Sequence, residues 1–79
     1  MRKEIDMVHF TQTDMVLRHL EMFGEITPAV ALGEYGIQRL ASRIGDLKRR
    51  GVKIRSRMYS GRNRIGLPVR YAVYSLAED

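Results

Sequence analysis

The 79-residue sequence contains no cysteine, no tryptophan and only two prolines. Without cysteine the chain can form neither disulfides nor thiolate metal sites, and His9 and His19 alone are too few to complete a structural zinc site. The fold must therefore depend on the packing of apolar side chains. A chain of this length makes one small domain that buries roughly 60% of its unfolded surface.

Long apolar runs are also missing. No stretch approaches the roughly 20 apolar residues of a membrane span, and the first residues lack the apolar core of a signal peptide. No glycine-rich phosphate loop before a helix, paired metal ligands or nucleophile arrangement is visible. We therefore expect a cytoplasmic protein that is not an enzyme, with no cofactor, no metal, no membrane contact and no small-molecule substrate.

Acidic residues are scarce in the middle of the chain. Residues 38–70 hold eleven of the fourteen Lys and Arg residues and a single acid, Asp46, so this segment carries a charge of +10. Residues 1–37 carry −3 and residues 71–79 carry −2, within a net charge of +5. A concentrated basic segment matches a polyanion. Because the basic residues continue beyond one helix, nucleic acid is favoured over a membrane surface.

Residues 1–10 mix both charges without a clean period, which predicts a frayed lead-in, with an extended piece near residues 7–10, before a domain over residues 11–77. Thr11 followed by Asp14 is typical of a capping box, and Gly24 of a helix end, so a helix should begin near Gln12. Its inward residues should be Val16, Leu17, Leu20 and Phe23, and its outward ones Arg18, His19 and Glu21. His19 is expected at the surface.

Residues 26–51 have the pattern of a short helix, a tight turn and a longer basic helix, which is a helix-turn-helix. Thr27 is a suitable N-cap, and Pro28 then falls at the first helical position. Gly36 can take the left-handed conformation that ends a helix. Glu25 and Ile26 leave room for one short extra strand, with Ile26 in the core.

The second helix is predicted over residues 37–50 from apolar positions that recur at steps of three and four. Its inward face should hold Ile37, Leu40, Ala41, Ile44, Leu47 and the alkyl part of Lys48. The opposite face should hold Gln38, Arg39, Ser42, Asp46 and Arg49, flanked by Arg43 and Arg50. Taken alone this is also the pattern of an ordinary solvated face. Gly45 costs about 1 kcal/mol relative to Ala, which indicates either a close backbone approach or simple tolerance.

After Gly51 the period changes to two, which predicts a strand. Val52, Ile54, Ser56 and Met58 should face inward, opposite Lys53, Arg55, Arg57 and Tyr59. The row of cations fits either a solvated edge or a surface beside phosphates. Residues 60–68 have a loop composition, and residues 69–76 form a second strand with Ala72, Tyr74 and Leu76 as its core face. The whole is the α+β layout of a winged helix-turn-helix domain, three helices followed by a two-stranded wing.

The chain also resembles the small winged helix-turn-helix domains of phage and bacterial proteins. The resemblance covers residues 11 to 76. The matching pieces are Gln12-Thr13-Asp14, Val16-Leu17, His19-Leu20, Ile26-Thr27-Pro28, Ala31-Leu32, Tyr35-Gly36-Ile37, Arg39-Leu40-Ala41, Arg43-Ile44, Asp46-Leu47, Gly51, Tyr71-Ala72 and Tyr74.

The resemblance implies double-stranded DNA binding by a small regulator of transcription or an accessory factor. The helix over residues 37–50 would lie in the major groove and the basic wing, residues 60–68, on the backbone or minor groove. Gln38, Arg39, Ser42 and Arg43 would approach base edges. Backbone contacts are expected from Thr27, Arg49, Arg50, Lys53, Arg62, Asn63 and Arg64.

Other functions fit the same fold. The main alternative is a protein-protein interaction module that uses an apolar patch such as Met7, Met22 and Tyr59. RNA could bind the same basic surface, and Tyr59 and Tyr71 could stack on single-stranded bases, although tyrosine in a strand more often packs against its neighbours. A homodimer or a protein partner would help so small a module to bind DNA tightly.

Overall fold

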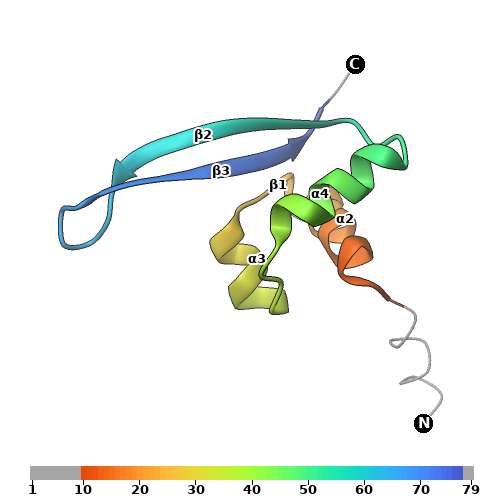
Figure 1. Cartoon of the computed structure of the whole chain (residues 1–79), viewed down its shortest axis with the longest axis horizontal. Coiled ribbons are helices and arrows are strands. Elements are labelled where there is room, and N and C mark those ends of the chain that lie inside the picture. Colours follow the sequence, from red (N-terminus) through yellow and green to blue (C-terminus); the bar gives the residue numbers. More distant parts are fainter. Residues whose placement is uncertain (1–9, 78–79) are drawn as a thin grey trace, which may run out of the picture.

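A computed structural model describes residues 10–77. The predicted lead-in and its extended piece therefore lie, except for Phe10, outside the described residues, as does Met7. The elements are, in order, α2 (Gln12–Phe23), β1 (Glu25–Ile26), α3 (Pro28–Tyr35), α4 (Leu40–Arg49), β2 (Ile54–Arg62) and β3 (Pro68–Leu76). The helices lie on one side of an antiparallel sheet of order β1-β3-β2, and the β2-β3 hairpin projects beyond them (Figure 1).

The helix ends are where local chemistry predicts them. The Thr11 hydroxyl accepts from the Asp14 N–H and the Asp14 carboxylate accepts from the Thr11 N–H, each at 3.1 Å, which completes the capping box of α2. Thr27 caps α3 through the Val30 N–H, with Pro28 at its first position. Gly24 and Gly36 end α2 and α3 in the left-handed conformation. These predicted boundaries are confirmed.

The core is formed by the three helices and the short strand β1. Its fully buried members include Val16 and Leu20 of α2, Ile26 of β1, Ile37 and Leu47. The extra strand is confirmed, because Ile26 is paired with Tyr74 of β3. Burial of each such side chain contributes about 1.5–3 kcal/mol relative to leaving it exposed. This small core fixes how α2, α3 and α4 cross.

The second helix of the predicted helix-turn-helix begins three residues later than expected. Residues 37–39 are not helical, and α4 starts after Arg39, whose backbone is non-helical and whose side chain makes no cap hydrogen bond. The Ile37 N–H instead donates to the carbonyl of Ala31, which closes the end of α3 behind Gly36. Ile37 thus belongs to the turn, although its burial continues the apolar period of the helix.

The buried stripe of α4 is also rotated from its predicted position. Leu40, Ile44 and Leu47 are buried as expected, but Ala41 and Lys48 are exposed. Asp46, predicted on the outer face, and Arg43, predicted on its flank, are both half-buried. The reason is that α2 packs alongside α4 (Figure 1), and Thr13 of α2 donates a hydrogen bond to the Asp46 carboxylate.

Two predictions for α2 are wrong. His19 is buried, with 8% of its surface exposed, because its Nδ1 pairs with the Tyr35 hydroxyl at 2.6 Å. Phe23 is 64% exposed, since it lies at the last position of the helix, beyond the core. Its ring instead packs on His19, with centroids 4.6 Å apart.

The hairpin is longer and more exposed than predicted. β2 begins at Ile54 instead of Val52 and continues to Arg62, so the loop shortens to residues 63–67. Ser56 and Met58 are exposed because the helices cover only the near part of the hairpin. Tyr74 and Leu76 pack on the core as predicted, but Val73, on the opposite face, is the most buried residue of β3.

Candidate nucleic-acid interface

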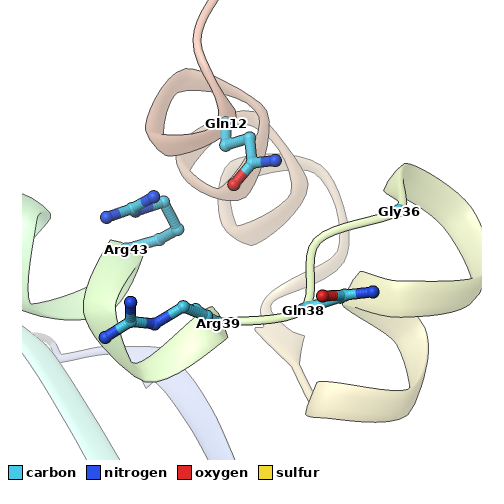
Figure 2. Close-up of a pocket in the computed structure, with 5 residues that line it drawn as sticks. All are labelled: Gln12, Gly36, Gln38, Arg39 and Arg43. Atoms are coloured by element: carbon cyan, nitrogen blue, oxygen red, sulfur yellow. The ribbon is translucent and has the colours of Figure 1, made fainter.

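Three of the four predicted base-reading residues lie together. Gln38 and Arg39 come from the turn between α3 and α4, and Arg43 comes from the first turns of α4. With Gly36 and Gln12, the first residue of α2, they line an open pocket of about 200 Å³. Figure 2 shows the guanidinium groups of Arg39 and Arg43 on one side, Gln38 and Gly36 on the other, and the Gln12 amide above the space between them.

Polar groups of α2 and α4 gather around the Asp46 carboxylate. The Asp46 carboxylate accepts a hydrogen bond from the Thr13 hydroxyl at 3.1 Å. The same carboxylate forms ion pairs with Arg43, through Nε at 3.0 Å, and with Arg49. Asp46 therefore lies between the two helices, close to the Arg43 Nε, which is buried and makes no hydrogen bond within residues 10–77.

A second ion pair joins the start of α2 to the end of α4. The Arg50 guanidinium lies 3.3 Å from the carboxylate of Asp14, which also belongs to the capping box. One of the predicted backbone-contacting residues is thus already paired within the protein. Because the pair is partly exposed, Arg50 can leave Asp14 and bind a phosphate at a modest cost in free energy.

Both carboxyl groups of this network have lowered pKa values. Hydrogen bonds from the backbone and hydroxyl of Thr11, followed by that of Arg50, hold the pKa of Asp14 below its ordinary value. The hydrogen bond from Thr13, followed by the charges of Arg43 and Arg49, lowers the pKa of Asp46. Both groups are therefore ionised at neutral pH, and the network is intact there.

The wing tip is a second basic region with a rigid base. The Asn63 side-chain oxygen accepts from the Ile65 and Leu67 N–H groups, at 3.1 and 2.9 Å. Arg62 donates to the carbonyl of Gly66 at 2.8 Å. Asn63 and Arg62 thus shape the turn, and Arg64 is exposed on it. The hairpin carries this tip away from the three helices (Figure 1).

The other predicted contact residues lie outside both the pocket and the wing tip. Ser42 is half-buried on the first turn of α4, and Arg49, 74% exposed, is near the other end of that helix. Thr27 caps α3, and Lys53 lies between α4 and β2.

Gln12 is the pocket residue that the sequence did not single out. It follows an N-cap and has no partner at a recognisable spacing, so its part in the pocket depends on how α2 crosses α4. Asp46 was predicted on an open face because the sequence does not show how α2 crosses α4. Neither position could be inferred from the helical period alone.

Two negative findings apply to residues 10–77. None of their helices is long and apolar enough to cross a bilayer. No three of their acidic or imidazole side chains gather as ligands for a metal ion.

A helix, then a short helix, a turn and a second helix, followed by a projecting hairpin, is the arrangement of the winged helix-turn-helix class. A model of the winged helix-turn-helix domain family matches residues 11–79. The chain therefore belongs to this family. No curated protein and no solved structure matches it.

Proposed function

We propose that the protein binds double-stranded DNA as a small regulator or accessory factor. The observation that carries the proposal is the gathering of Gln38, Arg39 and Arg43 at the exposed start of α4, within a family whose architecture suits DNA. The concentration of charge supports it, since residues 38–70 carry +10. In this arrangement α4 enters the major groove and the wing tip lies on the backbone or minor groove.

The side chains would divide into two groups. The base-reading group would hold Gln38, Arg39, Ser42 and Arg43, at the start of α4, where glutamine suits adenine and arginine suits guanine. The remaining contacts would go to phosphates and fix the register, from Thr27, Arg49, Arg50, Lys53, Arg62, Asn63 and Arg64. One such module makes a small interface, so two copies on two half-sites or a protein partner would raise the affinity.

The proposal is tested by following backbone amide shifts while a mixed-sequence duplex of about 16 base pairs is added, at low and at physiological salt. We expect changes in residues 37–50 and 60–68 that weaken as salt rises, because released counterions drive the binding. An absence of changes at low salt would contradict DNA binding.

The base-reading part has its own test. Arg39→Ala should reduce the preference for a selected site over a scrambled duplex, by about 1–3 kcal/mol for one bidentate contact. If the variant loses the same affinity for both duplexes, Arg39 contacts the backbone instead. The selected site would come from repeated rounds of binding to a random library.

A second candidate is a protein-binding module, favoured by the exposure of Met22 and Phe23 at the end of α2, at 61% and 64%. Exposed apolar side chains that form a contiguous patch are more typical of interaction sites than of an ordinary surface, and these two residues are consecutive in the chain. Of the other side chains predicted for this patch, Tyr59 lies on β2 and is 42% exposed. The amide titration separates the two functions, because DNA should leave residues 22 and 23 unchanged.

A further inference from the structure

The hairpin carries an aromatic pair on its outer face, the face that does not pack on the core. Tyr59 of β2 lies directly opposite Tyr71 of β3, and their ring centroids are 5.0 Å apart at an interplanar angle of 33°. Tyr74 packs on the helical core, so Tyr71, three residues earlier on the same strand, lies on the other face of the sheet. The two rings are 42% and 38% exposed. The pair is therefore a surface feature and not an extension of the core.

Gly61 makes room for the Tyr59 ring on this face. It follows Tyr59 by two residues, so both positions face the same side of the sheet. A Cβ built on Gly61 would lie 2.5 Å from the Tyr59 hydroxyl oxygen and 2.8 Å from two ring carbons. The ring thus leans along its own strand and fills the space that a side chain at position 61 would take. A glycine inside a strand, which usually weakens the strand, here positions an aromatic ring.

Two arginines continue the outer face along β2. Arg57 and Arg55 precede Tyr59 by two and four residues, so the three side chains leave the strand on one face, at steps of about 6.6 Å. Arg57 lies 3.4 Å from the carboxylate of Glu25, but both side chains are more than half exposed, so this pair opens at little cost. Within residues 10–77, Arg55 has no hydrogen-bond or ion-pair partner. A row of available cations therefore leads up to the two rings.

Exposed rings at the end of a row of cations have the chemistry of a surface for single-stranded nucleic acid. Aromatic rings stack on bases of any type, and guanidinium groups attract the phosphates that join those bases. A duplex cannot use the rings in this way, because its bases are stacked on one another. Tyrosine and arginine are also common in protein interfaces, but the segment that holds most of this face, residues 38–70, carries +10, which matches a polyanion.

We propose that the outer face of the hairpin binds a single-stranded nucleic acid, with bases stacked on the two tyrosine rings and phosphates beside the arginines of β2. The surface is formed by Arg55, Arg57, Tyr59 and Tyr71. It lies on the side of the sheet away from the helices, so it is separate from the start of α4. The inference therefore does not depend on duplex binding, and one molecule can hold a duplex and a single strand together.

Gly61→Ala gives the sharpest test, because it removes no ring and no charge. The new Cβ would displace the Tyr59 ring, whose hydroxyl end can rotate away without disturbing the backbone. Gly33→Ala is the control with the same chemical change, since a Cβ there would meet nothing within 4 Å. A second variant, Tyr59→Leu/Tyr71→Leu, removes both rings and keeps apolar side chains on the strands.

The first measurement follows the ring proton signals of Tyr59 and Tyr71 while a deoxyuridine oligonucleotide of about ten bases is added at low salt. We expect both rings to shift and saturate, together with the side-chain signals of Arg55 and Arg57. A uridine oligoribonucleotide of the same length forms the second arm, which separates DNA from RNA because the two strands differ only in the 2′-hydroxyl. If neither strand shifts the rings, or if the shifts are confined to residues 37–50, the proposal is overturned.

The second measurement compares affinities for the labelled single strand by fluorescence anisotropy. We expect a loss of at least about 25-fold in the double leucine variant and about fivefold in Gly61→Ala, because each stacked base contributes at least about fivefold. Gly33→Ala should bind the single strand like the wild type, and the double leucine variant should keep its affinity for the duplex.

Two outcomes of this comparison would contradict the stacking surface. In one, the double leucine variant and Gly61→Ala both bind the single strand as tightly as Gly33→Ala does. In the other, the double leucine variant loses the same affinity for the duplex as for the single strand. A wild type that binds the single strand at its rings but no duplex would contradict the proposed function alone, and the outer-face proposal would stand.

Discussion

His19 and Tyr35 show how a polar pair becomes part of a small core. His19 lies on α2 and Tyr35 at the end of α3, and their side chains meet at 2.6 Å between Nδ1 and the hydroxyl. Their rings also meet edge to face, with centroids 5.5 Å apart. Because His19 is almost fully buried, its ring nitrogen depends on this partner.

Tyr35→Phe removes the hydroxyl and keeps the ring. We expect a loss of roughly 1–3 kcal/mol in the free energy of unfolding, because the buried Nδ1 is left without its hydrogen bond. Urea unfolding followed by circular dichroism measures the change. Tyr59→Phe is the control, since Tyr59 is 42% exposed and its change should stay within about 0.5 kcal/mol. Equal losses in the two variants would show that the pair does not stabilise the fold.

The carboxyl groups of Asp14 and Asp46 make stability depend on pH in a defined direction. Their pKa values are lowered in the folded protein, so the unfolded chain binds more protons near those pKa values. The stabilisation is complete above the ordinary aspartate pKa of about 4 and is lost as pH falls through the lowered values. We expect the melting temperature to fall steadily below about pH 4.

The double variant Asp14→Asn/Asp46→Asn isolates this effect. It should melt below the wild type at pH 7, because the ties to Thr13 and Arg50 are weakened, and the gap should narrow as the pH is lowered. Glu21→Gln, at an exposed position of α2, serves as the control and should follow the wild-type curve. Parallel melting curves for the double variant and the wild type would contradict the assignment.

At the scale of the elements, the turn between α3 and α4 depends on one glycine and α4 tolerates another. Gly36 has φ +70°, a conformation that costs a side chain about 1–2 kcal/mol. Gly45 lies inside α4, and a Cβ built there would meet only an Arg49 nitrogen at 3.6 Å, an ordinary contact. Of the two explanations considered for Gly45, the structure therefore supports simple tolerance.

The same substitution at these two positions should have opposite effects. Gly36→Ala should destabilise the domain by roughly 1–2 kcal/mol, and Gly45→Ala should stabilise it by about 1 kcal/mol. Thermal unfolding resolves the difference, since 1 kcal/mol shifts the midpoint by about 4–8 °C in a domain of this size. If Gly45→Ala were instead destabilising, α4 would be strained in a way that its contacts do not show.

The elements that sequence could predict are those whose ends carry their own chemistry. Thr11 with Asp14, Thr27 with Pro28, and Gly36 each act on atoms a few residues away, so their helix ends were placed correctly. The start of α4 lacks such a signal. Arg39 makes no side-chain cap, and the apolar period runs on through Ile37. Only the closing hydrogen bond to Ala31 shows that the helix has not begun.

The candidate site was predictable in part for the same reason. The helix-turn-helix pattern put Gln38, Arg39 and Arg43 close together, and in the structure they line one pocket, while their part in reading bases stays a prediction. The contributions of Gln12 and Asp46 could not be predicted, because they arise where α2 packs along α4. The burial of His19 likewise depends on Tyr35, sixteen residues away, and no local pattern encodes that contact.

At the scale of the whole molecule, cations of the hairpin lie in two places, on the outer face of the sheet and at the wing tip. Arg57 of β2 lies opposite Val73 of β3, on the same face of the sheet as Glu25. Its guanidinium donates a hydrogen bond to the Glu25 carboxylate at 3.4 Å. That face is turned away from the helices, because Ile26, which points into the core, alternates with Glu25. The Tyr59 and Tyr71 rings lie on the same outer face, 5.0 Å apart. Arg62 and Arg64 of the wing tip lie at the far end of the hairpin, so they form a separate group from Arg55 and Arg57 of the outer face.

This separation gives a prediction about salt. If about five phosphates are neutralised, raising the salt from about 50 to 200 mM should reduce the affinity for DNA by roughly 10² to 10³. Arg62→Ala/Arg64→Ala should weaken binding to all sequences alike and lower the slope of log affinity against log salt by about two, because two phosphate contacts are lost. Arg55→Ala/Arg57→Ala removes the same charge from the outer face and should leave the slope nearly unchanged. Fluorescence anisotropy with a labelled duplex at four or more salt concentrations measures all three slopes. If the outer-face pair lowers the slope as much as the wing-tip pair, the duplex contacts both faces of the hairpin, and the wing does not bind through its tip alone.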